Sequence, residues 1–396
     1  MTYALMLIAL AGLGFVAHAV LTRRRQLHAL WREPVLRRPV LIIESDDWGA
    51  GPVAAQAEAL HRLVDLLTRF HDCSGRHPVV TLAMVLAVPD GPAIRRTGHY
   101  HRLTLEHPMF APVLAAIERG CKAGVFALQL HGLEHYWPPA LMASDEPEVR
   151  TWREADPPAL TECLPPHLQS RWTDASALPS RPLAVEDIWR AVRAEVALFI
   201  RVFGARPRVA VPPTFVWNET VEAAWAAEGI EVVSTPGLRS SCRNAAGLPD
   251  CDSPPLRNLQ SDRGVRYVVR DDYFEPERGH RAEDALRRLL DKWSCRRPCL
   301  LETHRSNFLG TAADTGRALA EIERLLSAAL TRLPDLRFMS TAELAQPGAQ
   351  VWTTAWPARL SAFLRRVTKA PGFRRLAVVT LVCVLTLAGA VVHAVL

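Results

Sequence analysis

The sequence predicts an α/β fold in which seven or eight parallel strands form a barrel. Three observations favour it. Short apolar runs rich in β-branched residues recur along the chain, amphipathic segments of helical period separate them, and ionisable residues cluster directly after the runs. Strands that alternate with helices form a mainly parallel sheet, because each helix returns the chain to the start of the next strand.

Eight segments have the pattern of a strand. In chain order they are residues 40–43, 79–87, 125–130, 208–211, 231–234, 267–270, 299–302 and 337–339. Five segments place apolar residues three and four positions apart, as on one face of an amphipathic helix. They are residues 106–119, 185–203, 219–228, 282–293 and 315–330. Eight strands with helices between them indicate a barrel.

Two long segments interrupt this alternation. Residues 144–182 are rich in Pro, Ser and acidic groups, and residues 235–262 are rich in Gly, Ser, Pro and Cys. Connections longer than about 12–15 residues in a compact domain are usually functional covers or disordered insertions. We therefore expect one barrel domain over residues 39–346, with two long loops, followed by a basic linker at 347–375.

Both ends of the chain are apolar. Residues 3–21 form 19 positions without a charge, and residues 376–396 form another 21. Each is close to the ~20 residues that a helix needs to cross a bilayer, so we expect a transmembrane anchor at both ends. A cleaved signal peptide is the alternative for the first, because Ala17-His18-Ala19 resembles a cleavage site. The arginines at 23–25 follow this segment instead of preceding it, which favours the anchor.

The charge distribution argues against nucleic acid as a partner. The chain carries a formal charge of +6, of which residues 1–38 contribute +5 and residues 347–396 contribute +6, leaving −5 for the region between them. That central region lacks the basic stripe of a nucleic-acid-binding protein. Arginines flank the inner side of both predicted anchors. This favours a body that faces the cytoplasm, close to membrane lipid, with the periplasmic side as the alternative.

Chemically active side chains follow several of the predicted strands. Asp46 and Asp47 follow the first, His131 and His135 the third, and His304 the seventh. Because the carboxyl ends of parallel strands share one rim, we expect these side chains to lie close together. Two histidines four residues apart face one side of a helical turn. One aspartate would complete a site for a divalent metal with open positions for water and substrate.

The residues left over suit hydrolysis. The aspartate that does not bind the metal can take a proton from the attacking water, and His304 can protonate the leaving group. This combination is typical of metal-assisted cleavage of an amide or ester.

These motifs resemble those of the polysaccharide deacetylases of the NodB-homology family, carbohydrate esterase family four. The resemblance covers about residues 39–346. It is carried by Asp46-Asp47, by the His-x-x-x-His motif of His131 and His135, by Glu302-Thr303-His304, and by Val211-Pro212-Pro213-Thr214-Phe215. It implies a deformed β/α barrel and a divalent metal, with zinc the first candidate. It also implies removal of an acyl group from an N-acylated sugar.

By the same resemblance, Asp46 is the catalytic base and His304 the general acid, while Asp47, His131 and His135 bind the metal. With membrane anchors at both ends, a lipid-linked or cell-envelope saccharide is the expected substrate.

The chain departs from the family pattern at several positions. Trp48 stands where the family has Gly after its aspartate pair, and Val211 stands where the family has an Arg that positions the base. Arg208 and Arg305 are the candidates to replace that arginine. The usual fourth motif is not clearly present, and Asp271 or Asp272 is the candidate to orient His304.

Two other functions fit parts of the pattern. A glycosyltransferase would use the acidic pair to hold a metal on a nucleotide sugar, but it leaves the three rim histidines without a role. A non-catalytic membrane-anchored binding module would keep the barrel with a degenerate site. A further histidine cluster consists of His99, His101 and His107. We interpret it as part of a loop and not as the primary site.

Overall fold

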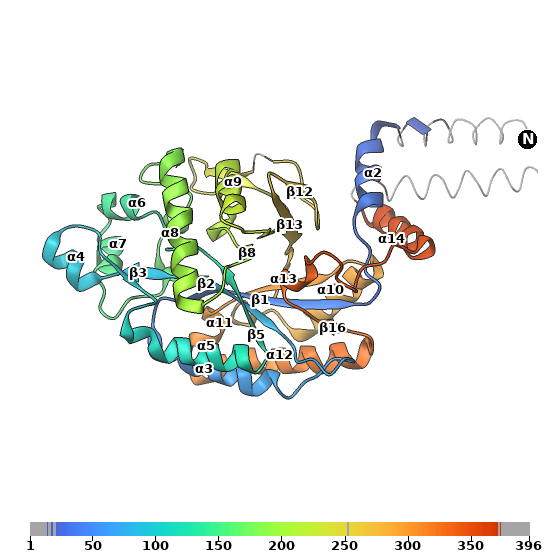
Figure 1. Cartoon of the computed structure of the whole chain (residues 1–396), viewed down its shortest axis with the longest axis horizontal. Helices are drawn as coiled ribbons and strands as arrows, with labels where there is room; N and C mark the ends of the chain where they lie inside the picture. The colour runs from blue at the N-terminus through green and yellow to red at the C-terminus, as the bar shows by residue number, and fades with distance from the viewer. Residues whose placement is uncertain (1–13, 15–16, 19–20, 252, 371–372, 374–396) are drawn as a thin grey trace, which may run out of the picture. The chain divides into compact units, whose positions relative to one another are not determined.

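The computed structural model describes residues 14, 17–18, 21–251, 253–370 and 373. These fall into two units, one of residues 38–291 and 298–351, the other of the described residues up to 37, 292–297 and from 352 onward. The first unit is built on a curled sheet whose strands run in the order β12-β13-β9-β8-β5-β2-β1-β15-β14, with β16 also paired to β1 (Figure 1).

Eight strands of this path are mutually parallel, and only the terminal β12 is antiparallel to its neighbour. No pairing among the described residues joins the two ends of the path, so the barrel is open. A deformed barrel with eight parallel strands agrees with the architecture that we predicted from the sequence. The strands are β1 Val40–Gly49, β2 Val80–Val85, β5 Phe126–Leu130, β8 Val209–Ala210, β9 Val232–Thr235, β12 Ser261–Asp262, β13 Val265–Val269, β14 Asp272–Tyr273, β15 Cys299–His304 and β16 Arg337–Phe338.

β1 is an interior strand that pairs with β2 and β15, and every one of its residues is buried. Strands on both sides satisfy its backbone, and its complete burial explains its almost continuous apolar start. α3 (Val53–Leu67), α5 (Ala111–Lys122) and α12 (Ala312–Arg332) lie together along one face of the sheet (Figure 1). Each turns its apolar residues inward, as the helical spacing predicts.

Further helices complete this unit. They are α4 Gly91–Thr97, α6 Pro138–Ala143, α7 Pro147–Arg153, α8 Val185–Phe203, α9 Glu219–Ala227, α10 Ala282–Ser294, α11 Ser306–Leu309 and α13 Thr341–Leu344, with the last residues of α10 assigned to the other unit. α8 has the predicted bounds, because Gly204 ends it in a left-handed conformation. Asn218 caps α9 through a hydrogen bond to the backbone N–H of Val221.

The two long connections contain structure of their own. Residues 144–182 include α7 and the short β6–β7 pair (Thr173–Asp174 and Arg181–Pro182), and they pack Trp152, Leu164 and Leu168 around Tyr136. Residues 235–262 include the β10–β11 hairpin, Ser240–Arg243 and Pro249–Cys251. The first segment is therefore organised around buried side chains, and the described part of the second contains a hairpin.

The second unit contains α2 (Arg24–Arg32) and α14 (Trp356–Lys369), the latter inside the segment predicted as a linker. Arg366 is 2% exposed and donates hydrogen bonds to the carbonyl oxygens of Glu33, Pro34 and Cys295. The predicted anchors at 3–21 and 376–396 fall almost entirely outside the described residues. Within the described part of the chain, none of the helices combines the length and apolar character needed to span a bilayer.

Candidate active site

A β-bulge at the end of β1 places two neighbouring carboxylates at the same rim. Side chains alternate between the faces of a regular strand, so Asp46 and Asp47 would point in opposite directions. Here the pairing with β2 slips between Ser45 and Trp48, which inserts one extra residue into β1. Asp47 takes up the irregularity with a φ of 72°, a left-handed conformation that Asp tolerates better than most residues. Both side chains consequently line one cavity.

His131 and His135 come from the loop that follows β5. The loop is irregular and not the helical turn predicted, yet the two rings lie 4.8 Å apart between centroids. Gly132 has a φ of 99°, and a Cβ there would lie 2.7 Å from the Glu134 carbonyl oxygen, so the turn requires glycine. The Nε2 atoms of His131 and His135 lie 3.4 and 3.2 Å from Oδ1 of Asp47. The structure thus brings together three residues that are far apart in the sequence.

This group has the donor set and the unsatisfied atoms expected of a metal site. One potential ligand atom from each of Asp47, His131 and His135 lies within 4.8 Å of the other two. All three residues are buried, and Oδ1 of Asp47 makes no hydrogen bond, although two ring nitrogens lie within ion-pair distance. A buried carboxylate oxygen without a hydrogen bond is costly, and a divalent cation would compensate it. Two imidazoles and one carboxylate suit zinc and similar ions.

The protonation states of His135 and Asp47 suit metal binding. Burial lowers the pKa of His135 to about 4, so this ring is neutral near pH 7. Burial opposes ionisation of Asp47, but His135 and His131 outweigh it and hold the pKa of Asp47 well below its usual range. Nδ1 of His131 lies 2.9 Å from the carbonyl oxygen of Val211. Because a carbonyl only accepts, that nitrogen carries the proton in the neutral ring, and Nε2 is then the atom that can bind a metal. Burial opposes protonation of His131, but Asp47 and Asp46 outweigh it and raise its pKa, so a metal ion would have to displace a proton from Nε2.

Arg270, at the end of β13, holds the other aspartate of the pair. Its Nη1 and Nη2 donate to the two oxygens of Asp46 at 2.9 and 2.6 Å, and Nη1 also donates to Glu44 at 2.8 Å. Nε forms an ion pair of 3.1 Å with Glu302. Arg270 is fully buried, so its charge is compensated by these three carboxylates and not by water.

This arginine keeps Asp46 ionised. Burial by itself would raise the pKa of Asp46, but the Arg270 guanidinium and nearby His131 outweigh it and lower that pKa. The candidates named from the sequence for this role were wrong. Arg208 forms its ion pair with Glu231, and Arg305 forms its ion pair with Glu162.

His304 lies beside Asp46, because β15 pairs with β1 in a register that aligns these two residues. Its Nδ1 lies 2.6 Å from Oε1 of Glu275, so Glu275 orients this ring and not Asp271 or Asp272. Asn307 donates to the other Glu275 oxygen and fixes the carboxylate in turn. Burial opposes protonation of His304, but the hydrogen bond to Glu275 and the charges of Asp47 and Asp46 raise its pKa to about 10. At neutral pH the metal-free ring is a cation with a proton on Nε2.

A cavity of about 400 Å³ joins these groups. Its walls include Asp46, Asp47, His131, His135, Glu302 and His304, together with Pro212, Thr214 and Phe215. The connection 144–182 contributes Glu162, Pro166 and Gln169, and the Glu162–Arg305 ion pair ties it to the rim. The size is that of a small-molecule site. Trp217 is fully buried and donates to Glu222, so it belongs to the core and offers no surface for a sugar.

Sequence reasoning gave no role to two residues of this site, namely Arg270 and Glu275. Arg270 had a signal, because it is the last residue of an apolar strand predicted to end at the rim. Glu275 follows β14, which is too short to be recognised by periodicity. The three histidines that we assigned to a loop, His99, His101 and His107, are all exposed, and none of them lines the cavity.

Comparison with known proteins shows similarity in the fold at low identity. No protein-family model matches the chain, and no curated protein matches it. A family 4 carbohydrate esterase from Streptomyces lividans in complex with acetate is 11% identical, with a TM-score of 0.34 over 76% of this chain and 92% of that one. The peptidoglycan deacetylase PdaC from Bacillus subtilis is 11% identical, with a TM-score of 0.35 over 78% and 90%.

A 4-alpha-glucanotransferase from Thermococcus litoralis is 12% identical, with a TM-score of 0.43 over 78% of this chain but only 41% of that one. This chain therefore spans less than half of the glucanotransferase it matches. At such identities and scores we infer chemistry from the chain's own residues. Family 4 carbohydrate esterases, the polysaccharide deacetylases that the sequence motifs resemble, are among the structural neighbours of this chain.

Proposed function

We propose that this protein is a metal-dependent hydrolase that removes an acyl group from the nitrogen of an amino sugar. One observation carries the proposal. A buried Asp-His-His group lies at the same rim as an aspartate held ionised by Arg270 and a histidine held by Glu275. A metal site, a base and an acid together are the components that amide hydrolysis requires.

A divalent ion, with zinc the first candidate, would be held by Asp47, His131 and His135 and would supply the Lewis acid for attack of water on the amide carbonyl. Asp46 faces the cavity as a carboxylate and accepts the proton that the attacking water loses. Arg270 fixes both of its oxygens, so the base is oriented before substrate enters.

His304 provides the proton that the leaving nitrogen needs. Its Nδ1 is engaged by Glu275, which leaves the Nε2 proton for the substrate. As the new C–O bond forms and the C–N bond breaks, one proton moves from water to Asp46 and another from His304 to the departing amine. The products are a carboxylic acid and a free amino sugar, and the two side chains regain their starting states by exchanging protons with solvent.

Arg270 also bears on the alternative functions. A degenerate binding module was suggested by the missing arginine before Pro212, and Arg270 supplies an arginine on the base from another strand. A glycosyltransferase would leave the His304–Glu275 pair without a role. Both features favour the hydrolase.

We propose a lipid-linked or cell-envelope saccharide as the substrate, reached from the cytoplasmic side by a chain anchored at 3–21 and 376–396. Support comes from the two uncharged segments and the arginines that flank their inner sides. Resistance of the protein to extraction from membranes by alkaline carbonate is the expected result. Complete release into the soluble fraction would contradict the anchors.

The direct test is acetate release from an N-acetylated oligosaccharide by the metal-loaded protein. Asp46→Asn should lower kcat/KM by about 10²- to 10⁴-fold, the usual contribution of a general base, while the metal content stays unchanged. Asp145→Asn, on the exposed part of the long loop, is the matched control and should retain activity. Unaltered turnover in Asp46→Asn would remove the base from this mechanism.

A further inference from the structure

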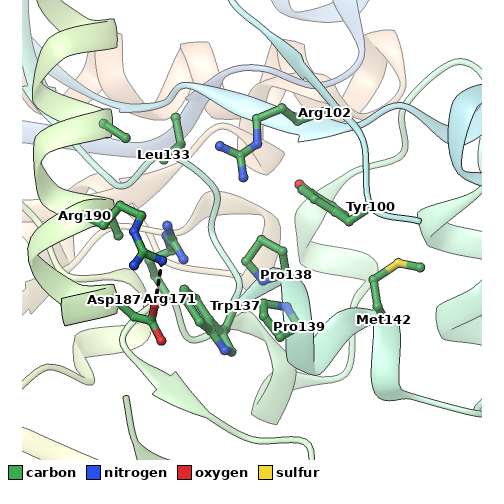
Figure 2. A pocket seen from close by; sticks show the side chains of 12 residues that line it. Tyr100, Arg102, Leu133, Trp137, Pro138, Pro139, Met142, Arg171, Asp187 and Arg190 are labelled. Carbon is green, nitrogen blue, oxygen red and sulfur yellow. Dashed lines mark hydrogen bonds and ion pairs between the residues drawn. The ribbon is translucent and has the colours of Figure 1, made fainter. Parts of the chain in front are cut away.

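A second cavity, of about 380 Å³, includes Leu133 in its wall, a residue of the loop that carries His131 and His135. Its walls come from residues around β4 (Arg102–Thr104), from the loop that follows His135, from α6 and from α8. Figure 2 shows Tyr100, Arg102 and Met142 on one side, Arg190 on the other, and Pro138 with Pro139 between them. This cavity shares no lining residue with the cavity over Asp46 and Asp47.

The walls combine apolar surface with an excess of positive charge. Arg102, Arg171 and Arg190 line the cavity, whereas Asp187 is the only carboxylate among its lining residues. Asp187 is paired with Arg190 at 2.9 Å. Arg102 and Arg171 share one buried carboxylate behind the wall, that of Glu134, at 2.9 and 3.6 Å. Arg102 and Arg190 thus have close carboxylate partners, whereas Arg171 has only the longer contact to Glu134.

Glu195, the other carboxyl group near Arg171, does not line the cavity. Its two oxygens accept hydrogen bonds from Trp225 Nε1 and from the backbone N–H of Leu133.

Arg171 has donors that nothing in the described part of the chain uses. The residue is 2% exposed, and its Nε and Nη1 atoms are buried without a hydrogen-bond partner. Its remaining contacts are the long ion pair to Glu134 and the faces of Trp137 and Trp172, at 5.1 and 5.4 Å from the ring centroids. Buried guanidinium donors are normally satisfied, because leaving them unpaired costs free energy. A ligand with acceptor atoms would satisfy them.

We propose that this cavity binds a small amphipathic carboxylate, such as a medium-chain fatty acid, with its head group on Arg171 and its tail among the apolar walls. The buried, unpaired donors of Arg171 call for an acceptor group, and guanidinium donors suit a carboxylate. Leu133, Trp137, the two prolines and Met142 surround the tail with apolar surface. The proposal is independent of the deacylase activity, because it concerns a separate cavity and can be tested by binding alone.

Titration of octanoate into the purified full-length protein, followed by calorimetry, tests this site. We expect saturable binding of one octanoate per chain, with 1-octanol bound at least about tenfold more weakly because it lacks the charge. One charge-assisted hydrogen bond accounts for a difference of this size. Ala191→Leu, which adds a side chain to the cavity wall on α8 without changing a charge, should weaken octanoate binding about tenfold or more.

Two arginine variants complete the experiment. Arg171→Met should also weaken octanoate binding about tenfold or more. Arg193→Met, on α8 but outside the cavity walls, is the matched control and should bind octanoate within about twofold of the natural protein. Absence of saturable binding would overturn the proposal, as would equal binding by Ala191→Leu. Equal affinity for octanoate and 1-octanol would overturn the assignment of Arg171 to the carboxylate.

Discussion

Replacing Arg270 by Met tests how the base is held. The residue is fully buried and contacts Glu44, Asp46 and Glu302, so the variant leaves three buried carboxyl groups without their shared cation. The hydrogen bonds to Asp46, of 2.9 and 2.6 Å, are charge-assisted, and each such bond contributes about 1.5–3 kcal/mol. Removal of one partner of a buried ion pair costs about 3–5 kcal/mol. We expect the free energy of unfolding at pH 8 to fall by an amount in this range.

The pH dependence of that loss has a definite sign. In the natural protein the lowered pKa of Asp46 contributes stability that is present above its unfolded value and is lost as pH falls. In Arg270→Met, burial without the compensating cation favours the protonated forms of Asp46 and Glu302, so these two groups take up protons as the pH falls. The difference in stability between the two proteins should therefore shrink between pH 8 and pH 5.

Urea denaturation of both proteins across this range measures the effect. Arg208→Met is the matched control, because Arg208 contacts Glu231 through two bonds of 2.8 Å but is partly exposed, as is its partner. Exposed ion pairs contribute about 0–1 kcal/mol, so this variant should lose little stability. In the activity assay the acid limb of kcat/KM should move to higher pH in Arg270→Met only. A loss below about 1 kcal/mol with an unmoved acid limb would refute the role given to Arg270.

Further predictions concern the acid and the bulge. In metal-free protein, His304→Gln should lower the free energy of unfolding by on the order of 2–4 kcal/mol near pH 6 and by progressively less as the pH rises toward 10. The reason is that the raised pKa of His304 stabilises the folded state only below that range. Exposed His101→Gln is the control, and a loss of stability in His304→Gln that does not vary with pH would contradict this linkage. Gly49→Ala should lower the free energy of unfolding by about 1–3 kcal/mol or more, because φ is 109° and the added Cβ would lie 2.5 Å from the Val85 carbonyl oxygen. Gly75→Ala, with φ of 81° and no atom within 4 Å, should cost less, and equal losses would show that the clash is absent.

The sequence predicted the parallel strands well because their burial produces continuous apolar runs. The strand predicted at 40–43 in fact extends to Gly49, because neighbouring strands continue to pair with β1 beyond its apolar part. β14 was missed, since two residues, one of them Asp272, carry no periodic signal. α14 was missed because its segment, which lies between the barrel and the apolar end of the chain, was interpreted as a basic linker. It depends on contacts of Arg366 with residues remote in sequence.

The candidate site was predictable where a motif repeats known chemistry and not where it depends on tertiary contacts. Asp46, Asp47, His131, His135 and His304 were named from their positions after strands, and the structure places them around one cavity. Arg270 and Glu275 reach Asp46 and His304 across the sheet, and no spacing in the sequence encodes that contact. The bulge that turns both aspartates to one side is likewise a property of the paired strands.

Metal content measured by elemental analysis tests the central claim most directly. After incubation with zinc and removal of unbound ions, the natural protein should hold one zinc per chain. His131→Ala and Asp47→Ala should hold almost none, whereas Asp46→Asn should still hold one. A natural protein that retains no ion, or a His131→Ala variant that retains as much as the natural protein, would contradict the metal site.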